Sequence, residues 1–240
     1  MMEMNRATGS ETIVWEGGGT ASDLTGDFLQ GVRDFAIVTE GSTDYAYITD
    51  SWYAPESSGN RIFKVSIDGG TLETTYAYAG GIVDITGQDF NTVSGITFDE
   101  TNSNFWTSGV DNDLASGTRA VNLVKHSSTL TNPSIYNIDD TGAGWDGILA
   151  LEWFSGWEGF SDGCLAALVY SYPEDGNIQD GPTIAAYEVL LIDHTDDPVT
   201  AASVKGTFGL PSFVKQARGL GRQTDTVVWW LAKEGTDDFW

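Results

Sequence analysis

The sequence predicts an all-β fold, and three observations carry this prediction. The run 61–67 alternates in the manner of a strand, so that Phe63, Val65 and Ile67 share one face. An Asp-Gly turn at 68–70 follows this run, and such a pair is typical of a hairpin because glycine accepts a positive φ. Aromatic residues make up 12% of the 240 residues, which favours strands over helices.

A repeated unit organises the chain. Four segments resemble one another, and each is followed by a β-rich run and then by a polar, acidic loop. In three of the four units, a third and a fourth β-rich run come next. The four related segments are 25–38, 86–98, 141–153 and 206–221.

Four consecutive strands in each unit predict a β-meander sheet, and repeated sheets of this kind arrange radially as a β-propeller. A β-sandwich also contains short strands with regular turns, but it does not predict internal repetition. We therefore expect a β-propeller of about four antiparallel sheets. The innermost strands are expected at 35–39, 96–99 and 149–153.

The repeat also predicts the domain organisation. Residues 1–10 are expected to form a flexible N-terminus, and residues 11–240 a single domain. The fourth unit supplies strands only at 217–221 and 227–232. We expect the run 11–16 to complete this last sheet, so that both ends of the chain share it, or another chain to donate the missing strand.

The repeat resembles that of NHL, YWTD and regucalcin-like propellers. The resemblance lies in "YAYITDSWYAPESSGNRIFKVSIDGG" followed by "VSGITFDETNSNFWTS", and it is strongest over residues 31–110. In those families a strand ending in Asp precedes a loop, an Asn-Arg-Ile strand, an Asp-Gly turn and a Gly-Ile inner strand. The resemblance implies the architecture but no activity, because one fold hosts many functions.

The charge of the chain restricts its partners. Eleven Lys and Arg face 35 Asp and Glu, which gives a formal net charge of −24. Such a surface repels phosphate backbones, so we expect no nucleic-acid partner. Solvated acidic loops are the simplest interpretation of this charge, and attraction of cations is the other.

Three features of the sequence indicate where the protein is located: its cysteine content, its apolar runs and its N-terminus. Cys164 is the one cysteine of the sequence and lies in an apolar run, where a small buried side chain is expected. No apolar run approaches the length of about 18 residues that a membrane helix needs, so membrane insertion is not expected. The N-terminus lacks the pattern of a signal peptide. An extracellular or virion-surface location without such a signal is expected, and a cytoplasmic location stays open.

Acidic loops suggest a calcium site. If the repeat is correct, the loops between the second and third strands lie on one rim, where oxygen-rich side chains suit Ca²⁺. The segment 175–181 resembles a calcium loop but lacks the spacing of the EF-hand. The predicted metal ligands are Asp111, Asp113, Asp175, Asn177 and Asp180.

Aromatic residues in loops suggest a binding surface for a protein or a glycan. Covering the edges of the sheets is the alternative interpretation of these side chains. The predicted ligand-binding residues are Trp52, Tyr53, Trp145, Trp157 and Tyr172.

The sequence therefore favours a non-enzymatic binding or structural module. We expect protein partners or copies of the same chain in a larger extracellular or virion-surface assembly, or a surface glycan. His126 and His194 are expected near outer turns, so no Ser-His-Asp arrangement is expected. The alternative is a calcium-dependent hydrolase, similar to propeller lactonases, with an acidic metal site at the central channel.

Overall fold

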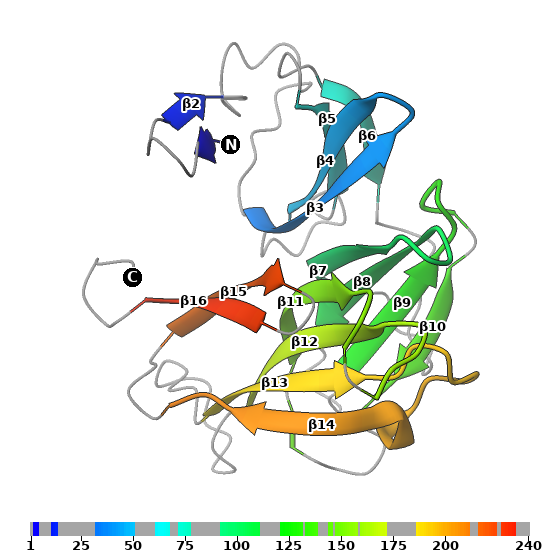
Figure 1. Cartoon of the computed structure of the whole chain (residues 1–240), viewed down its shortest axis with the longest axis vertical. Helices are drawn as coiled ribbons and strands as arrows, with labels where there is room; N and C mark the ends of the chain where they lie inside the picture. The colour runs from blue at the N-terminus through cyan, green and yellow to red at the C-terminus, as the bar shows by residue number, and fades with distance from the viewer. Residues whose placement is uncertain are drawn as a thin grey trace.

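The structure is a computed structural model of the chain, and β-strands are the main element of its described residues, with one short 3-10 helix at Ala201–Ser203 (Figure 1). Within the described part, no helix has the length and apolar character needed to cross a membrane. The described residues are 2–4, 11–13, 32–50, 61–67, 72–77, 92–110, 121–131, 133–138, 144–145, 147–157, 159–171, 186–211, 216–224 and 227–233.

Three antiparallel sheets of four strands follow one another along the chain, each in meander order. This confirms the predicted all-β class and the predicted meander sheets. The first sheet contains β3 (Val32–Glu40), β4 (Thr43–Asp50), β5 (Arg61–Ser66) and β6 (Leu72–Ala77). The second sheet contains β7 (Thr92–Asp99), β8 (Asn104–Val110), β9 (Val121–His126) and β10 (Ser134–Asn137). The third sheet contains β11 (Gly147–Phe154), β12 (Cys164–Ser171), β13 (Ala186–Ile192) and β14 (Val204–Gly209).

Two further sheets have two strands each among the described residues. One pairs β15 (Gln216–Thr224) with β16 (Val227–Lys233), and the other pairs β1 (Met2–Met4) with β2 (Glu11–Ile13). The run 11–16 was expected to pair directly with the last sheet. In the structure its described part pairs with β1 instead, because a chain reversal brings Met2 opposite Ile13. The predicted direct pairing is therefore wrong for these residues.

The first strands of the sheets lie side by side near the middle of the molecule (Figure 1). The segments expected to be innermost, 35–39, 96–99 and 149–153, lie in β3, β7 and β11. β15, the first strand of the β15–β16 sheet, also contacts β11 and β3. Contacts between first strands thus join β3 to β7, β7 to β11 and β11 to β15.

Apolar side chains pack each sheet face to face against the next one. Ala36 and Val38 of the first sheet pack with Ile96 and Phe105 of the second. The second sheet meets the third in a larger cluster, and the third meets β15. Burial of this apolar area is the main stabilising contribution to such a fold. Residues of the cluster between the second and third sheets include Trp106, Leu123, Leu151, Trp153 and Leu190.

Local sequence explains where strands turn and where they approach closely. Gly41 has a φ of +66° in the turn between β3 and β4, a conformation that glycine adopts readily. At Gly95, a Cβ atom would lie 2.8 Å from Leu151 Cγ, so only glycine lets β7 approach β11 this closely. Cys164 is buried in β12 as expected, and burial raises the pKa of its thiol to about 12.

Candidate functional site: the centre of the molecule

Asp34 joins three sheets at the centre of the molecule. Its side chain comes from β3 and is buried. Oδ2 accepts hydrogen bonds from the N–H of Ile96 in β7 and of Leu151 in β11, each at 3.0 Å, and Oδ1 accepts from the N–H of Phe35, also at 3.0 Å. We call this arrangement the Asp34 junction. One carboxylate therefore holds the first strands of three successive sheets.

A strand irregularity precedes each contact of the Asp34 junction. The pairing register shifts between Val32 and Phe35 in β3, and a comparable shift precedes Ile96 in β7. Another shift lies between Ile148 and Ala150 in β11. A β-bulge bends its strand and disturbs the regular ladder of backbone hydrogen bonds. Asp34 supplies acceptors to backbone donors next to these irregularities.

Hydroxyl groups extend the polar connection between the sheets. Thr49 Oγ1 donates to the carbonyl of Ser94 at 2.6 Å and accepts from the N–H of Asp34 at 3.0 Å. Ser94 Oγ in turn hydrogen-bonds the carbonyl of Ile148 and lies 3.0 Å from Ser108 Oγ. These buried polar groups satisfy one another, so the centre of the molecule is a connected network.

Two opposing effects act on the carboxyl group of Asp34. Burial raises the pKa of Asp34 well above its ordinary value, and the negative charge of Glu152 acts in the same direction. The three backbone N–H donors oppose this rise because they stabilise the ionised form. A carboxyl group held in this way orients backbone donors and has no oxygen directed only to solvent.

A cavity of about 280 Å³ lies beside the Asp34 junction, between the first strands. All four first strands contribute to its lining. Phe35 and Ile37 on β3 are 55% and 45% exposed, which is unusual for large apolar side chains on an inner strand. The lining residues used below are Phe35, Ile37, Phe98, Glu100, Glu152 and Leu220.

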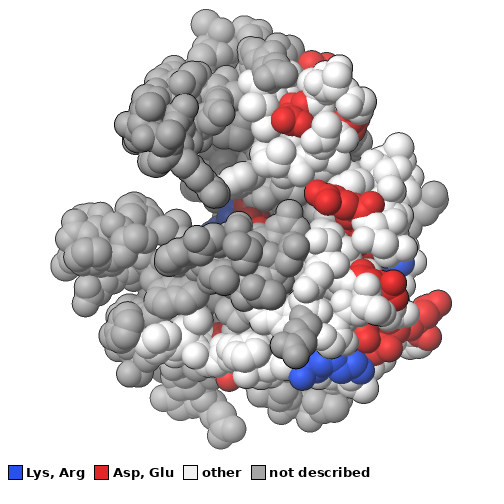
Figure 2. Space-filling model, viewed as in Figure 1, with Lys and Arg blue, Asp and Glu red and all other residues white. Residues whose placement is uncertain are grey.

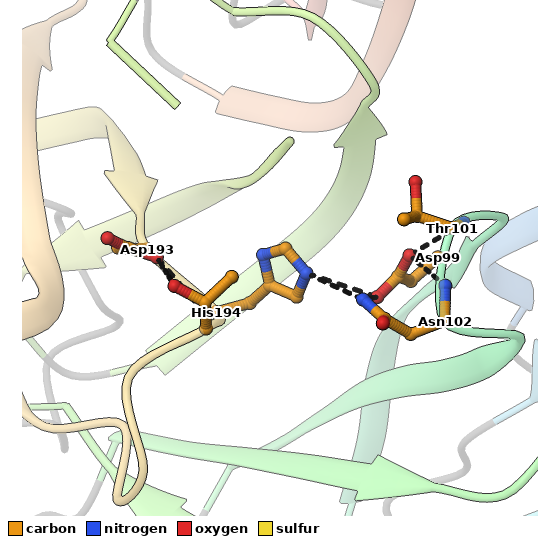
Figure 3. Close-up of polar contacts among 6 residues, drawn as sticks. Asp99, Thr101, Asn102, Asp193 and His194 are labelled. Carbon is orange, nitrogen blue, oxygen red and sulfur yellow. Dashed lines mark hydrogen bonds and ion pairs between the residues drawn. The ribbon is translucent and has the colours of Figure 1, made fainter. Parts of the chain in front are cut away.

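The buried pair of His194 and Asp99 fixes the turn that places Glu100 at this cavity (Figure 3). His194 Nε2 lies 3.1 Å from Asp99 Oδ2, and Asn102 Nδ2 donates to the same oxygen at 2.9 Å. The backbone N–H groups of Thr101 and Asn102 donate to Asp99 Oδ1 at 2.9 and 3.0 Å. The turn between β7 and β8 is therefore held by its own aspartate and by a side chain of the third sheet.

Asp99 is ionised more readily than an ordinary aspartate. Burial alone would raise its pKa, but the hydrogen bonds from His194 and Asn102 outweigh burial and lower the pKa below the ordinary value. His194 lies edge-on to Trp153 at 4.8 Å between ring centroids, and to Trp106 at 6.2 Å. The pair is enclosed between two sheets, and its position indicates a structural contact.

His126 occupies a comparable position at the end of β9. Its Nε2 lies 2.9 Å from Thr107 Oγ1, and the side chain is buried. Burial lowers the pKa of His126 to about 4, so the imidazole is neutral at neutral pH. Both histidines were expected near outer turns, and His126 lies at the end of β9. The contact of His194 with Asp99 was not expected from the sequence.

Two of the five predicted ligand-binding aromatic residues lie within the described residues, and both pack against the third sheet. Trp145 is half-buried, and its Nε1 donates to Glu188 Oε2 at 2.8 Å. Trp157 is half-buried with its ring edge-on to Phe154, 5.3 Å between centroids. Trp157 also lines a cavity of about 310 Å³ together with Phe208 and Leu210, so the ligand-binding role of these two rings stays a prediction. Trp52, Tyr53 and Tyr172 lie outside the described residues.

The predicted calcium ligands also lie outside the described residues, so the calcium site stays a prediction. These ligands are Asp111, Asp113, Asp175, Asn177 and Asp180. Among the residues that the structure does describe, no three His, Cys, Asp or Glu side chains group so as to hold a metal ion.

The Asp34 junction was not recognised from the sequence, although a signal is present. Asp34 shares a strand face with Ala36 and Val38, which are buried, in an alternating run from 32 to 40. An acidic residue on the apolar face of a strand needs hydrogen-bond partners inside the protein.

Neither models of protein families nor curated proteins gave a match for the chain.

We predict that Asp34→Ala strongly destabilises the protein. The substitution leaves the N–H groups of Phe35, Ile96 and Leu151 without their acceptor. The donors of Ile96 and Leu151 are buried, and an unsatisfied buried donor costs about 1–3 kcal/mol, so the free energy of unfolding should fall by at least about 2 kcal/mol. Urea unfolding measures this, with Asp162→Ala at an exposed position as the control. A fall of less than about 1 kcal/mol in the free energy of unfolding of Asp34→Ala would show that the Asp34 junction does not stabilise the contact between the sheets.

We also predict that His126 makes stability depend on pH between 6.5 and about 4. In this window the unfolded chain binds a proton at His126, whereas the folded protein does not, so stability falls as the pH falls. The pKa difference corresponds to about 3 kcal/mol. Urea unfolding at several pH values should show this loss in the wild type and a flatter profile in His126→Gln. An unchanged profile in the variant would assign the loss to other groups.

Proposed function

We propose that the chain is a non-enzymatic β-propeller binding module whose ligand site is the central cavity. The observation that carries the proposal is the convergence of four first strands on one cavity with exposed apolar and acidic side chains. Concave sites where several structural elements converge are the usual place for ligands. Rigid strands anchored by the Asp34 junction would hold the shape of this site.

The propeller part of the proposal concerns the last sheet. β15–β16 and β1–β2 are both two-stranded among the described residues, and isolated two-stranded sheets are marginally stable in water. Docked edge to edge, they would form a fourth sheet with four strands, equal to the other three. The third sheet already packs on Ala217 and Leu220 of β15, which supports β15 as the inner strand of that sheet.

Deletion of residues 1–17 tests this closure. The deletion removes β1 and β2, so the last sheet would lose its outer strands and the melting temperature should fall sharply. Thr12→Pro is a milder variant that removes one backbone donor from β2, and it should lower the melting temperature in part. If the shortened protein melts like the intact one, the N-terminal hairpin does not complete the sheet.

The described polar groups support binding over catalysis. Asp34 accepts three backbone hydrogen bonds, Asp99 is held by His194 and its own turn, and His126 contacts Thr107. Each is buried and serves a contact between strands or sheets. The side chains exposed at the cavity supply contact area and negative charge.

We further propose that the module belongs to an extracellular or virion-surface assembly. The support is the net charge of −24, which disfavours nucleic acid and keeps a protein soluble at high copy number. Acidic side chains are distributed over the described part of the face in Figure 2. Contacts with other proteins or with copies of this chain would form the assembly.

Crystals soaked with a chemically mixed set of small fragments test the ligand site. The set should include neutral, anionic and cationic fragments, each with an aromatic ring. We expect bound fragments to concentrate between Phe35 and Glu152, because all four first strands line this cavity. Fragments that scatter over the surface and leave this cavity empty would overturn the proposed site. Phe35→Ser serves as the matched variant and should lose the fragments.

A further inference from the structure

The face of β3 that carries Phe35 and Ile37 is open toward the central cavity. Along β3, burial alternates: Asp34, Ala36 and Val38 are buried, whereas Phe35 and Ile37 are exposed. The described residues include three exposed large apolar side chains, and two of them are this pair. Exposed apolar residues that lie together on one strand mark an interaction surface more often than scattered ones do.

The central cavity continues outward as a groove. A second cavity of about 570 Å³ lies between the first and second sheets, and it shares Ile37, Phe98 and Glu100 with the central one. Because three lining residues are common to both, the two cavities form one path. The volumes fall near the range of about 300–1,000 Å³ typical of ligand pockets. We call this path the β3 groove.

The charges along the β3 groove are negative. Glu100 is exposed at the turn between β7 and β8. Glu152 lines the central part, and Glu40 lines the outer part, where Lys64 Nζ lies 2.6 Å from its Oε2. No Lys or Arg is among the described lining residues of either cavity. Because Lys64 offsets the charge of Glu40, the negative charge that favours a positive ligand comes mainly from Glu100, which lines both cavities.

We propose that the β3 groove binds an extended peptide segment in which basic and apolar residues alternate. This inference rests on the proposed function and names the ligand class of the same site. An extended peptide places successive side chains on opposite sides, so one side would contact Phe35 and Ile37 while the other reaches Glu100. Phe98 and Phe35 add aromatic rings that attract a Lys or Arg side chain.

A labelled synthetic peptide tests the inference directly. Fluorescence anisotropy would compare a fluorescein-labelled peptide of alternating Lys and Leu with two relatives, one of Glu and Leu and one of Lys and Ser. We expect binding of the Lys-Leu peptide, weaker binding of the Lys-Ser peptide and no binding of the Glu-Leu peptide. Affinity should fall as salt is added, because part of the attraction is electrostatic.

Matched variants locate the peptide. Phe35→Ser should weaken binding by about tenfold or more, since it removes a large apolar contact. Glu100→Gln should weaken binding by up to about fivefold and reduce the salt dependence. The controls are Phe208→Ser, at a side chain that is 53% exposed on β14, and Glu73→Gln, at an exposed position on β6. Both controls should bind within about twofold of the wild type.

Three results would overturn the inference. Equal binding of the Lys-Leu and Glu-Leu peptides would show that charge does not select the ligand. Equal losses in the controls and the groove variants would place the peptide elsewhere. Self-association that Phe35→Ser abolishes, without peptide binding, would assign the groove to a second copy of the chain.

The fragment soaks separate this inference from the proposed function. Fragments in the cavity together with no peptide binding would mean that the site is correct and the ligand class is wrong. An empty cavity in the soaks and no peptide binding would overturn both. Circular dichroism of Phe35→Ser and Glu100→Gln confirms folding before each measurement.

Discussion

One buried carboxylate organises this structure. The first strand of a meander sheet pairs with a neighbour on one side only, so the backbone groups on its other side need partners elsewhere. At the centre of this molecule, Asp34 supplies acceptors for Ile96 in β7 and Leu151 in β11. The positions of three sheets therefore depend on a single side chain of the first.

This constraint couples the polar centre to the apolar clusters around it. The clusters between successive sheets supply most of the favourable burial, but apolar packing alone does not fix how far one sheet slides along the next. Directional hydrogen bonds, which Asp34 accepts and which Thr49 and Ser94 donate, fix the position of each sheet along the next. The same anchoring keeps β3 in place while its other face stays open, and that face forms the inner wall of the proposed binding groove.

The architecture was predictable from the sequence to the level of its sheets. Alternating runs and the repeated segments predicted the four-strand meanders and located the first strands within β3, β7 and β11. Repetition identifies strands well because each unit must bury the same faces. The pairing of the N-terminal run was not predictable in this way, because β1 carries no repeat and its pairing with β2 depends only on local reversal.

The site was less predictable than the sheets. Trp145 Nε1 donates to Glu188, a partner that the sequence pattern did not indicate, and the expected role of Trp145 in ligand binding stays a prediction. The Asp34 junction and the His194–Asp99 contact join residues far apart in the chain. Sequence patterns report which face a residue occupies, but not which residue of another sheet faces it.

Amide hydrogen exchange at Ile96 and Leu151 tests the central claim most directly. Both amides donate to Asp34 where three sheets meet. Their hydrogen bonds should open, and their protons exchange with solvent, only when the sheets separate. We expect each to exchange as slowly as the slowest amides of the central strand β12, which is buried along its length. Exchange of either amide on the timescale of an exposed turn, such as Gly41 and Ser42, would show that Asp34 does not hold the sheets together.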